Sequence, residues 1–232
     1  MARVFLAVAV AAALVCSGCG SDQTATNGSA TPPKVFIEWD ATGATNTIPS
    51  YKTELITTIQ HLAAEHDEVL AAVLDGQPIT TASVSARNFA EAPPETEAPE
   101  VPAMEQAAAE GFARDFIATS AKREQVRGSG QLQGLLVASR TPGVSEIMLW
   151  SDGVVNEPGG PDLSNASPAE VEAEITRWKP QLASLKGKTV VIVGGGRGVH
   201  RIVTVERAHR LFQALVEGNG GHLVWIPTLA QR

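Results

Sequence analysis

The sequence predicts an α/β protein with a three-layer, doubly wound, mostly parallel six-stranded sheet and helices on both faces. Short apolar runs suited to buried strands alternate with longer segments of helical periodicity. Strands that alternate with helices favour a parallel sheet, and right-handed crossovers then place helices on both of its faces. The chain has 232 residues, of which 44% are hydrophobic, so it is long enough to form a core without disulfides.

The N-terminal residues are typical of an export signal followed by a tether. Residues 1–18 combine a positive charge at Arg3 with an unbroken apolar run, Val4–Val15, which is too short to span a membrane. Small residues before Cys19 resemble a bacterial lipobox, in which Cys19 would be the lipidated first residue of the mature protein. Cys16 departs from that pattern, because an aliphatic residue is preferred there, and ordinary cleavage is the alternative. Residues 19–33 are rich in Ser, Thr, Asn, Gly and Pro, which predicts a flexible tether.

Residues 34–232 are expected to form the folded domain. Its predicted strands are Val35–Trp39, Val69–Leu74, the edge strand Ile79–Phe89, Ile147–Trp150, Thr189–Val193 and His222–Ile226. Helices are expected to begin at Pro49, after Ser129 and at Ser167. Another is expected where Met104 and Phe116 lie on one apolar stripe, and a last one is expected with Thr204 as its N-cap. Ser167–Glu170 has the pattern of a capping box, and Pro180 is expected to kink that helix. Residues 91–102 are acidic and rich in proline, which indicates a loop.

Composition disfavours several function classes. The net charge is -7 and no basic run exists, so nucleic acid is a poor partner. Cys16 and Cys19 are the only cysteines, which leaves the domain without a disulfide framework or a cysteine metal cluster. The sequence has no stretch of about 20 consecutive apolar residues, so no transmembrane helix is predicted.

Three short motifs end predicted strands or open a predicted helix. Asp40 ends the first strand and is followed by Thr42 and Thr45, Gly128-Ser129 precedes a helix, and Ser151-Asp152-Gly153 closes a later strand. In this order the motifs resemble the metal-ion-dependent adhesion site of von Willebrand factor A domains. The resemblance covers roughly residues 34–227 and implies the doubly wound fold described above.

The resemblance implies that Asp40, Thr42, Ser129 and Asp152 hold Mg²⁺ or Mn²⁺, with Thr45 and Asn46 nearby. Hydroxyl and carboxylate oxygens are the ligands that such hard cations prefer. Ala44 departs from the family pattern, because a second serine ligand belongs at that position. In this family the cation recruits an acidic residue of a protein partner. We therefore expect a non-enzymatic protein-binding module, lipid-anchored outside the cell membrane.

Other interpretations stay open at this stage. The domain could retain the fold with a vestigial metal site, or it could be an envelope lipoprotein that binds a small ligand. The run Gly194–Gly198 lacks the third glycine of the dinucleotide fingerprint, which disfavours a nucleotide partner. Ser129 lies in Gly-Ser-Gly and not in a nucleophile elbow, which disfavours a serine hydrolase.

Overall fold

The computed structural model describes residues 33–42, 49–65, 67–80, 83–89, 101–122, 128–156, 162–199 and 201–226. All of these belong to one compact unit, Thr31–Arg232. The predicted signal peptide (1–18), the predicted lipidation site Cys19 and residues 20–32 of the predicted tether lie outside the described residues. The same holds for Ala44, Thr45 and Asn46.

A six-stranded, mostly parallel sheet forms the middle layer, which confirms the predicted fold class. The strands are β1 Lys34–Asp40, β2 Glu68–Leu74, β3 Val84–Asn88, β4 Val144–Trp150, β5 Thr189–Val193 and β6 His222–Ile226. Their order is β3-β2-β1-β4-β5-β6, and only β3 is antiparallel to its neighbour. This architecture is consistent with Rossmann-like and von Willebrand factor A-like folds.

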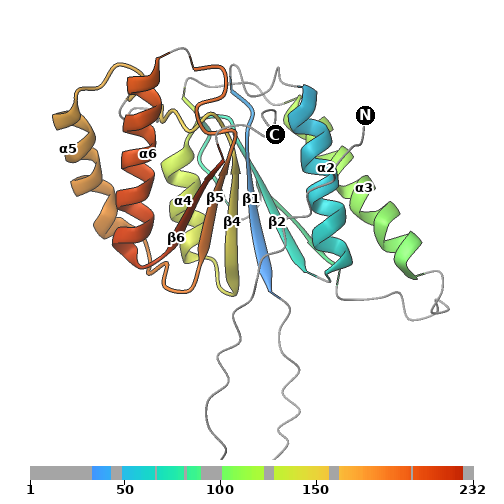
Figure 1. Ribbon diagram of the computed structural model, residues 1–232. Helices are drawn as coiled ribbons and strands as arrows, with labels where there is room; N and C mark the ends of the chain where they lie inside the picture. Colours follow the sequence, from blue (N-terminus) through green and yellow to red (C-terminus); the bar gives the residue numbers. More distant parts are fainter. Residues whose placement is uncertain are drawn as a thin grey trace, which may run out of the picture. The chain divides into compact units, whose positions relative to one another are not determined.

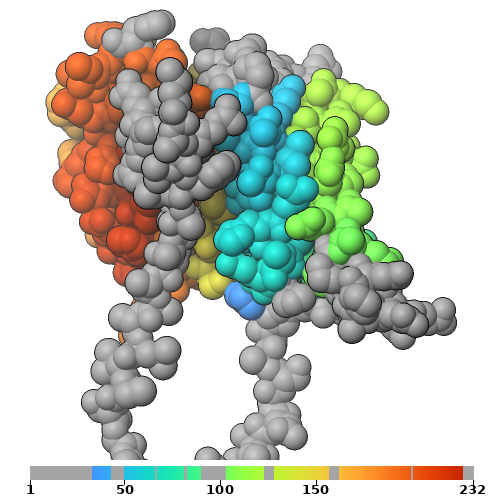
Figure 2. All heavy atoms as spheres, turned by 45° about the vertical axis from the view of Figure 1, so that its right-hand side comes forward, coloured from blue at the N-terminus to red at the C-terminus, as the bar shows by residue number. Residues whose placement is uncertain are grey.

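Helices cover both faces of the sheet. They are α2 Pro49–Ala64, α3 Val101–Ser120, α4 Gln131–Arg140, α5 Pro168–Trp178 and α6 Ile202–Val216. Helices α4, α5 and α6 lie on one face, and α2 and α3 lie on the other (Figure 1). Figure 2 shows α2 and α3 side by side on their face.

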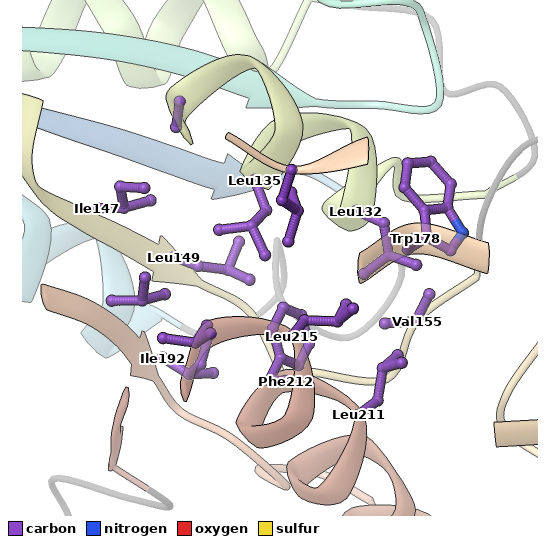
Figure 3. Close-up of a cluster of buried hydrophobic side chains, with 14 of the residues drawn as sticks. Leu132, Leu135, Ile147, Leu149, Val155, Trp178, Ile192, Leu211, Phe212 and Leu215 are labelled. Atoms are coloured by element: carbon purple, nitrogen blue, oxygen red, sulfur yellow. The ribbon is translucent and has the colours of Figure 1, made fainter. Parts of the chain in front are cut away.

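Each face of the sheet has its own hydrophobic core. On one face, side chains of β4 and β5 such as Leu149 and Ile192 contact Leu211 and Phe212 of α6, with Leu132 of α4 beside them (Figure 3). On the other face, Trp39 packs edge-on against Tyr51 of α2, with ring centroids 6.4 Å apart, and both side chains are fully buried. Because strands buried on both faces need mostly apolar residues, β2 is a continuous apolar run after Glu68, whereas the apolar run of β1 is interrupted by the buried Glu38.

Two predicted boundaries of the antiparallel edge are wrong. The edge strand occupies only Val84–Asn88, since Asp75 accepts a hydrogen bond from the backbone N–H of Gln77 and the chain turns before the strand starts. The predicted loop 91–102 ends too late, because α3 already begins at Val101. Residues 91–100 lie outside the described residues.

Two helix-end predictions also need correction. Helix α5 has the predicted capping box at Ser167 and Glu170, but it ends at Trp178 instead of kinking at Pro180. A 3-10 turn, Lys179–Gln181, follows, because proline has no N–H to continue the α-helical ladder. Thr204 does not cap α6; Arg201 holds that position, and the Thr204 hydroxyl donates to the carbonyl oxygen of Ser164 instead.

Among the described residues, no helix is both long and apolar enough to cross a membrane.

Candidate functional site

The strand order reverses between β1 and β4, and the predicted site lies there. From β1 the chain crosses to α2 on one face, and from β4 it crosses to α5 on the other. Asp40 is the last residue of β1, while Asp152 follows β4 by two positions. Trp39 and Trp150 are register partners, so the two strand ends are neighbours at the carboxyl edge. In doubly wound folds, ligands bind at this edge.

Asp40 is buried and accepts four hydrogen bonds. Its Oδ1 accepts from the backbone N–H of Thr42 at 2.9 Å and from the Thr42 hydroxyl at 2.5 Å. Its Oδ2 accepts from the Ser151 hydroxyl at 2.7 Å and from Nε2 of Gln131 at 3.2 Å. Burial raises the pKa of Asp40, and the bonds from Thr42, Ser151 and Gln131 oppose that shift. Because every partner donates to it, the carboxylate is the form that this hydrogen-bond network accommodates.

Asp152 is more accessible and has fewer partners. Its Oδ1 accepts from the backbone N–H of Val154 at 2.8 Å. Burial, together with the charge of Asp40, raises the pKa of Asp152 from 3.8 to about 6, against the lowering effects of the hydrogen bonds from Val154 and Ser151. The two carboxylates are therefore close enough to repel each other, and a bound cation would relieve that repulsion.

Thr42 and Ser129, the predicted hydroxyl ligands, are held differently. The Thr42 hydroxyl donates a hydrogen bond to Asp40, which leaves the lone pairs of the hydroxyl oxygen for another partner. The Ser129 backbone N–H donates to the carbonyl of Asn156 at 2.6 Å, while its hydroxyl lies 3.5 Å from the same oxygen, beyond the usual range. Ser129 does not cap α4, because Gly130 holds the N-cap position in a left-handed conformation. No side-chain hydrogen bond joins Ser129 to Asp40 or Asp152 within the described part of the chain.

Gln131 is a site residue that the sequence motifs did not indicate. It is the first residue of α4 and is fully buried. Its Nε2 contacts Asp40, the Ser151 hydroxyl at 2.7 Å and the carbonyl oxygen of Val154 at 3.2 Å. The only signal in the sequence was its position two residues after Ser129, where a predicted helix begins.

The glycine-rich run is a tight turn after β5 whose glycines make room for large side chains. A Cβ on Gly194 would lie 1.6 Å from the Tyr51 hydroxyl oxygen, and one on Gly195 would lie 2.3 Å from the Trp225 ring. The backbone N–H of Gly196 donates to the carbonyl oxygen of Asp152 at 2.6 Å. Side-chain packing thus accounts for these glycines, and the hydrogen bond from Gly196 holds the turn against the loop that carries Asp152.

Arg197 fastens the same turn to the start of α2. Its Nη2 donates to the Ser50 hydroxyl at 2.9 Å, its guanidinium lies 4.6 Å from the Tyr51 ring centroid, and Nη1 lies 3.7 Å from Glu54 Oε1. Burial, together with the charge of Asp152, raises the pKa of Tyr51 to about 12, against the lowering effect of Arg197. The contacts of Arg197 with the start of α2 therefore lie within electrostatic range of the candidate site.

Three of the four predicted ligands thus meet at the switch point, namely Asp40, Thr42 and Asp152. Ser129 lies at the same edge through its bond to Asn156. No group of three or more His, Cys, Asp or Glu side chains that could hold a metal occurs among the described residues, so any cation here depends on hydroxyl oxygens as well as carboxylates. Thr45 and Asn46 lie outside the described residues.

Comparisons with protein-family models, with curated proteins and with solved structures find no match to this chain.

Proposed function

We propose that this chain is a lipid-anchored, extracytoplasmic protein whose domain is related to von Willebrand factor A domains and binds a protein partner through a divalent cation. The observation that carries the proposal is the meeting of Asp40 and Asp152 at the switch point, where the Thr42 hydroxyl binds the Asp40 carboxylate at 2.5 Å. Two mutually repelling carboxylates, one buried and one half-buried, form a site that a cation would stabilise.

The donor set suits Mg²⁺ or Mn²⁺. Hard cations take carboxylate, hydroxyl and water oxygens, and Mg²⁺ keeps several waters. Asp152 and Thr42 are half-buried, so both could hold a hydrated ion, with the Ser129 hydroxyl as a further ligand and Asp40 as an acceptor for bound water. With Asp152 as the only directly bound carboxylate and Asp40 acting through water, the ion keeps part of its positive charge, which leaves it attractive to an acidic side chain of a partner.

Apolar side chains next to this edge support a protein as the partner. Ile202 is 76% exposed and Val203 is 44% exposed at the start of α6. Gly196, which binds the Asp152 carbonyl, is packed against Val205 in the same turn of α6. A partner that places an acidic residue on the cation could therefore bury these two side chains as well, as interface cores do.

The membrane anchor rests on the N-terminal sequence alone. Cys19 would carry the acyl chains, and the tether that follows would leave the domain free to meet partners near the membrane surface. Metabolic labelling with a radioactive fatty acid tests this part directly. Label is expected on the wild-type chain and none on Cys19→Ser, whereas equal labelling of both would exclude Cys19 as the lipidation site.

One observation favours a second candidate, a domain of the same fold with a vestigial site. The four acceptor positions of Asp40 are already filled by protein donors. Thermal unfolding in Mg²⁺ and in chelator separates the two candidates. The proposed function requires a higher unfolding midpoint in Mg²⁺ for wild type and no such gain for Asp152→Ala, while identical responses would favour the vestigial site.

A further inference from the structure

The buried amide of Gln131 stands among oxygens that a cation would also seek. One nitrogen, Nε2, lies 2.7 Å from the Ser151 hydroxyl oxygen, 3.2 Å from Asp40 Oδ2 and 3.2 Å from the carbonyl oxygen of Val154. Gln131 and Ser151 are fully buried and Asp40 is 2% exposed. An amide nitrogen carries only two hydrogens, so it faces one oxygen more than it can satisfy.

The other end of the same amide is unsatisfied. The Oε1 atom of Gln131 is buried and has no hydrogen-bond partner among the described residues. A buried polar atom without a partner costs about 1–3 kcal/mol, so a purely structural glutamine would be expected to satisfy both ends. The side chain instead commits its donor end to the oxygens and leaves its acceptor end unused.

Two glycines of the α4 region let Gln131 lie close to these oxygens. Gly130 begins the helix in a left-handed conformation that glycine adopts readily. One turn further on, a Cβ on Gly134 would lie 2.7 Å from Oε2 of Glu38, so glycine lets α4 approach β1 closely. Because Glu38 and Asp40 lie on the same face of β1, the close approach at Gly134 also brings Gln131 against Asp40.

We propose that the Gln131 amide is a built-in substitute for the cation, which holds Asp40 and Ser151 together in the metal-free protein and competes with the cation for the site. The inference rests on the proposed cation site, and it names the residue that sets the cation affinity of that site. An N–H donor neutralises a carboxylate oxygen only partly, so a cation that displaces it must first break the amide contacts. Removing the amide should therefore tighten cation binding.

The test is calorimetric titration of the chelator-treated full chain, purified in detergent, with Mg²⁺ and with Mn²⁺. Wild type is compared with Gln131→Ala and with Gln131→Met, which keeps the volume of the side chain without its donor. Loss of even one charge-assisted hydrogen bond corresponds to a tightening of about tenfold in Kd or more. Gln133→Ala is the matched control, because Gln133 is half-buried on the same helix and, two positions from Gln131, lies on a different face of it.

Unfolding midpoints supply a second readout that does not depend on a partner. In chelator, Gln131→Met should be less stable than wild type, and saturating Mg²⁺ should restore more stability to the variant than to wild type. Cation binding by both chains, tighter in the variants, supports the proposed function and the inference together. Binding by the variants and none by wild type supports the inference and overturns the cation dependence of the natural chain. Equal affinity, weaker binding by the variants, or no binding by any chain overturns the inference.

Discussion

The two strand ends at the switch point each carry an aspartate, and the two side chains are held in opposite ways. Asp40, at the end of β1, is buried and accepts four hydrogen bonds from three residues. Asp152, beyond β4, is half-buried and accepts from the backbone of Val154, with a pKa raised to about 6. The same residue type is thus surrounded by hydrogen-bond donors after one strand and is more exposed after the other.

This difference separates a structural acidic residue from a responsive one. Donors surround Asp40, so hydrogen bonds within the protein offset part of the cost of burying its charge. Asp152 is partly desolvated without comparable compensation, so its charge costs the folded state free energy until a cation or a proton arrives. A ligand should therefore change the state of Asp152 far more than that of Asp40.

The largest expected effect comes from making the same isosteric change at both strand ends. Asp40→Asn would turn an amide group toward donors that now bind a carboxylate, and it should lower the free energy of unfolding by about 2–4 kcal/mol. Asp152→Asn keeps an oxygen for Val154 and removes a costly charge, so it should be neutral or stabilising at pH 7. Urea denaturation of both variants checks this, and equal losses would show that the two aspartates are held alike.

A second change tests whether the position of α4 creates the Asp40 network. Gly134→Ala would place a Cβ 2.7 Å from Glu38 and 2.9 Å from Leu74, and moving α4 away should cost about 1–3 kcal/mol. Gly111→Ala in α3 is the control, because nothing lies within 4 Å of its Cβ, and it should stabilise the protein by about 0.5–1 kcal/mol. If both substitutions act alike in urea denaturation, close approach of α4 is not needed.

The pH dependence of stability should contain a contribution from Asp152. Its pKa is raised from 3.8 to about 6 in the folded chain, so between those values the folded state binds more protons than the unfolded state. This group therefore makes the free energy of unfolding fall as pH rises from about 4 to 6, by about 1–2 kcal/mol after solvent screening. Metal-free denaturation at several pH values should show that fall reduced in Asp152→Asn. A fall of the same size in the variant would assign it to other groups.

The smallest stability effect is expected at Ser129. Its hydroxyl lies 3.5 Å from the carbonyl oxygen of Asn156, so Ser129→Ala should change the free energy of unfolding by less than about 0.5 kcal/mol. If the hydroxyl is a cation ligand, the same variant should lose about tenfold in Mg²⁺ affinity. A stability loss without an affinity loss would make Ser129 a structural residue only.

The sequence predicted the strands and the strand-end aspartates because buried parallel strands and their turns leave local patterns. Asp40 and Asp152 could be placed together, since the carboxyl ends of neighbouring parallel strands share one edge. Gln131 could not be found, because its role depends on how closely α4 approaches β1, which Gly134 and Glu38 determine at long range. Thr204 and Pro180 were misjudged for a related reason: a hydroxyl or a proline near a helix end has several local solutions, and tertiary contacts select among them.

The most direct test of the central claim is calorimetric titration of the chelator-treated full chain with Mg²⁺ and Mn²⁺, in parallel with Asp152→Asn. The account predicts saturable binding of one ion per chain by wild type and its loss in the variant, since Asp152 is the accessible carboxylate of the site. Absence of binding by wild type, or binding that survives unchanged in Asp152→Asn, would contradict a cation site between β1 and β4.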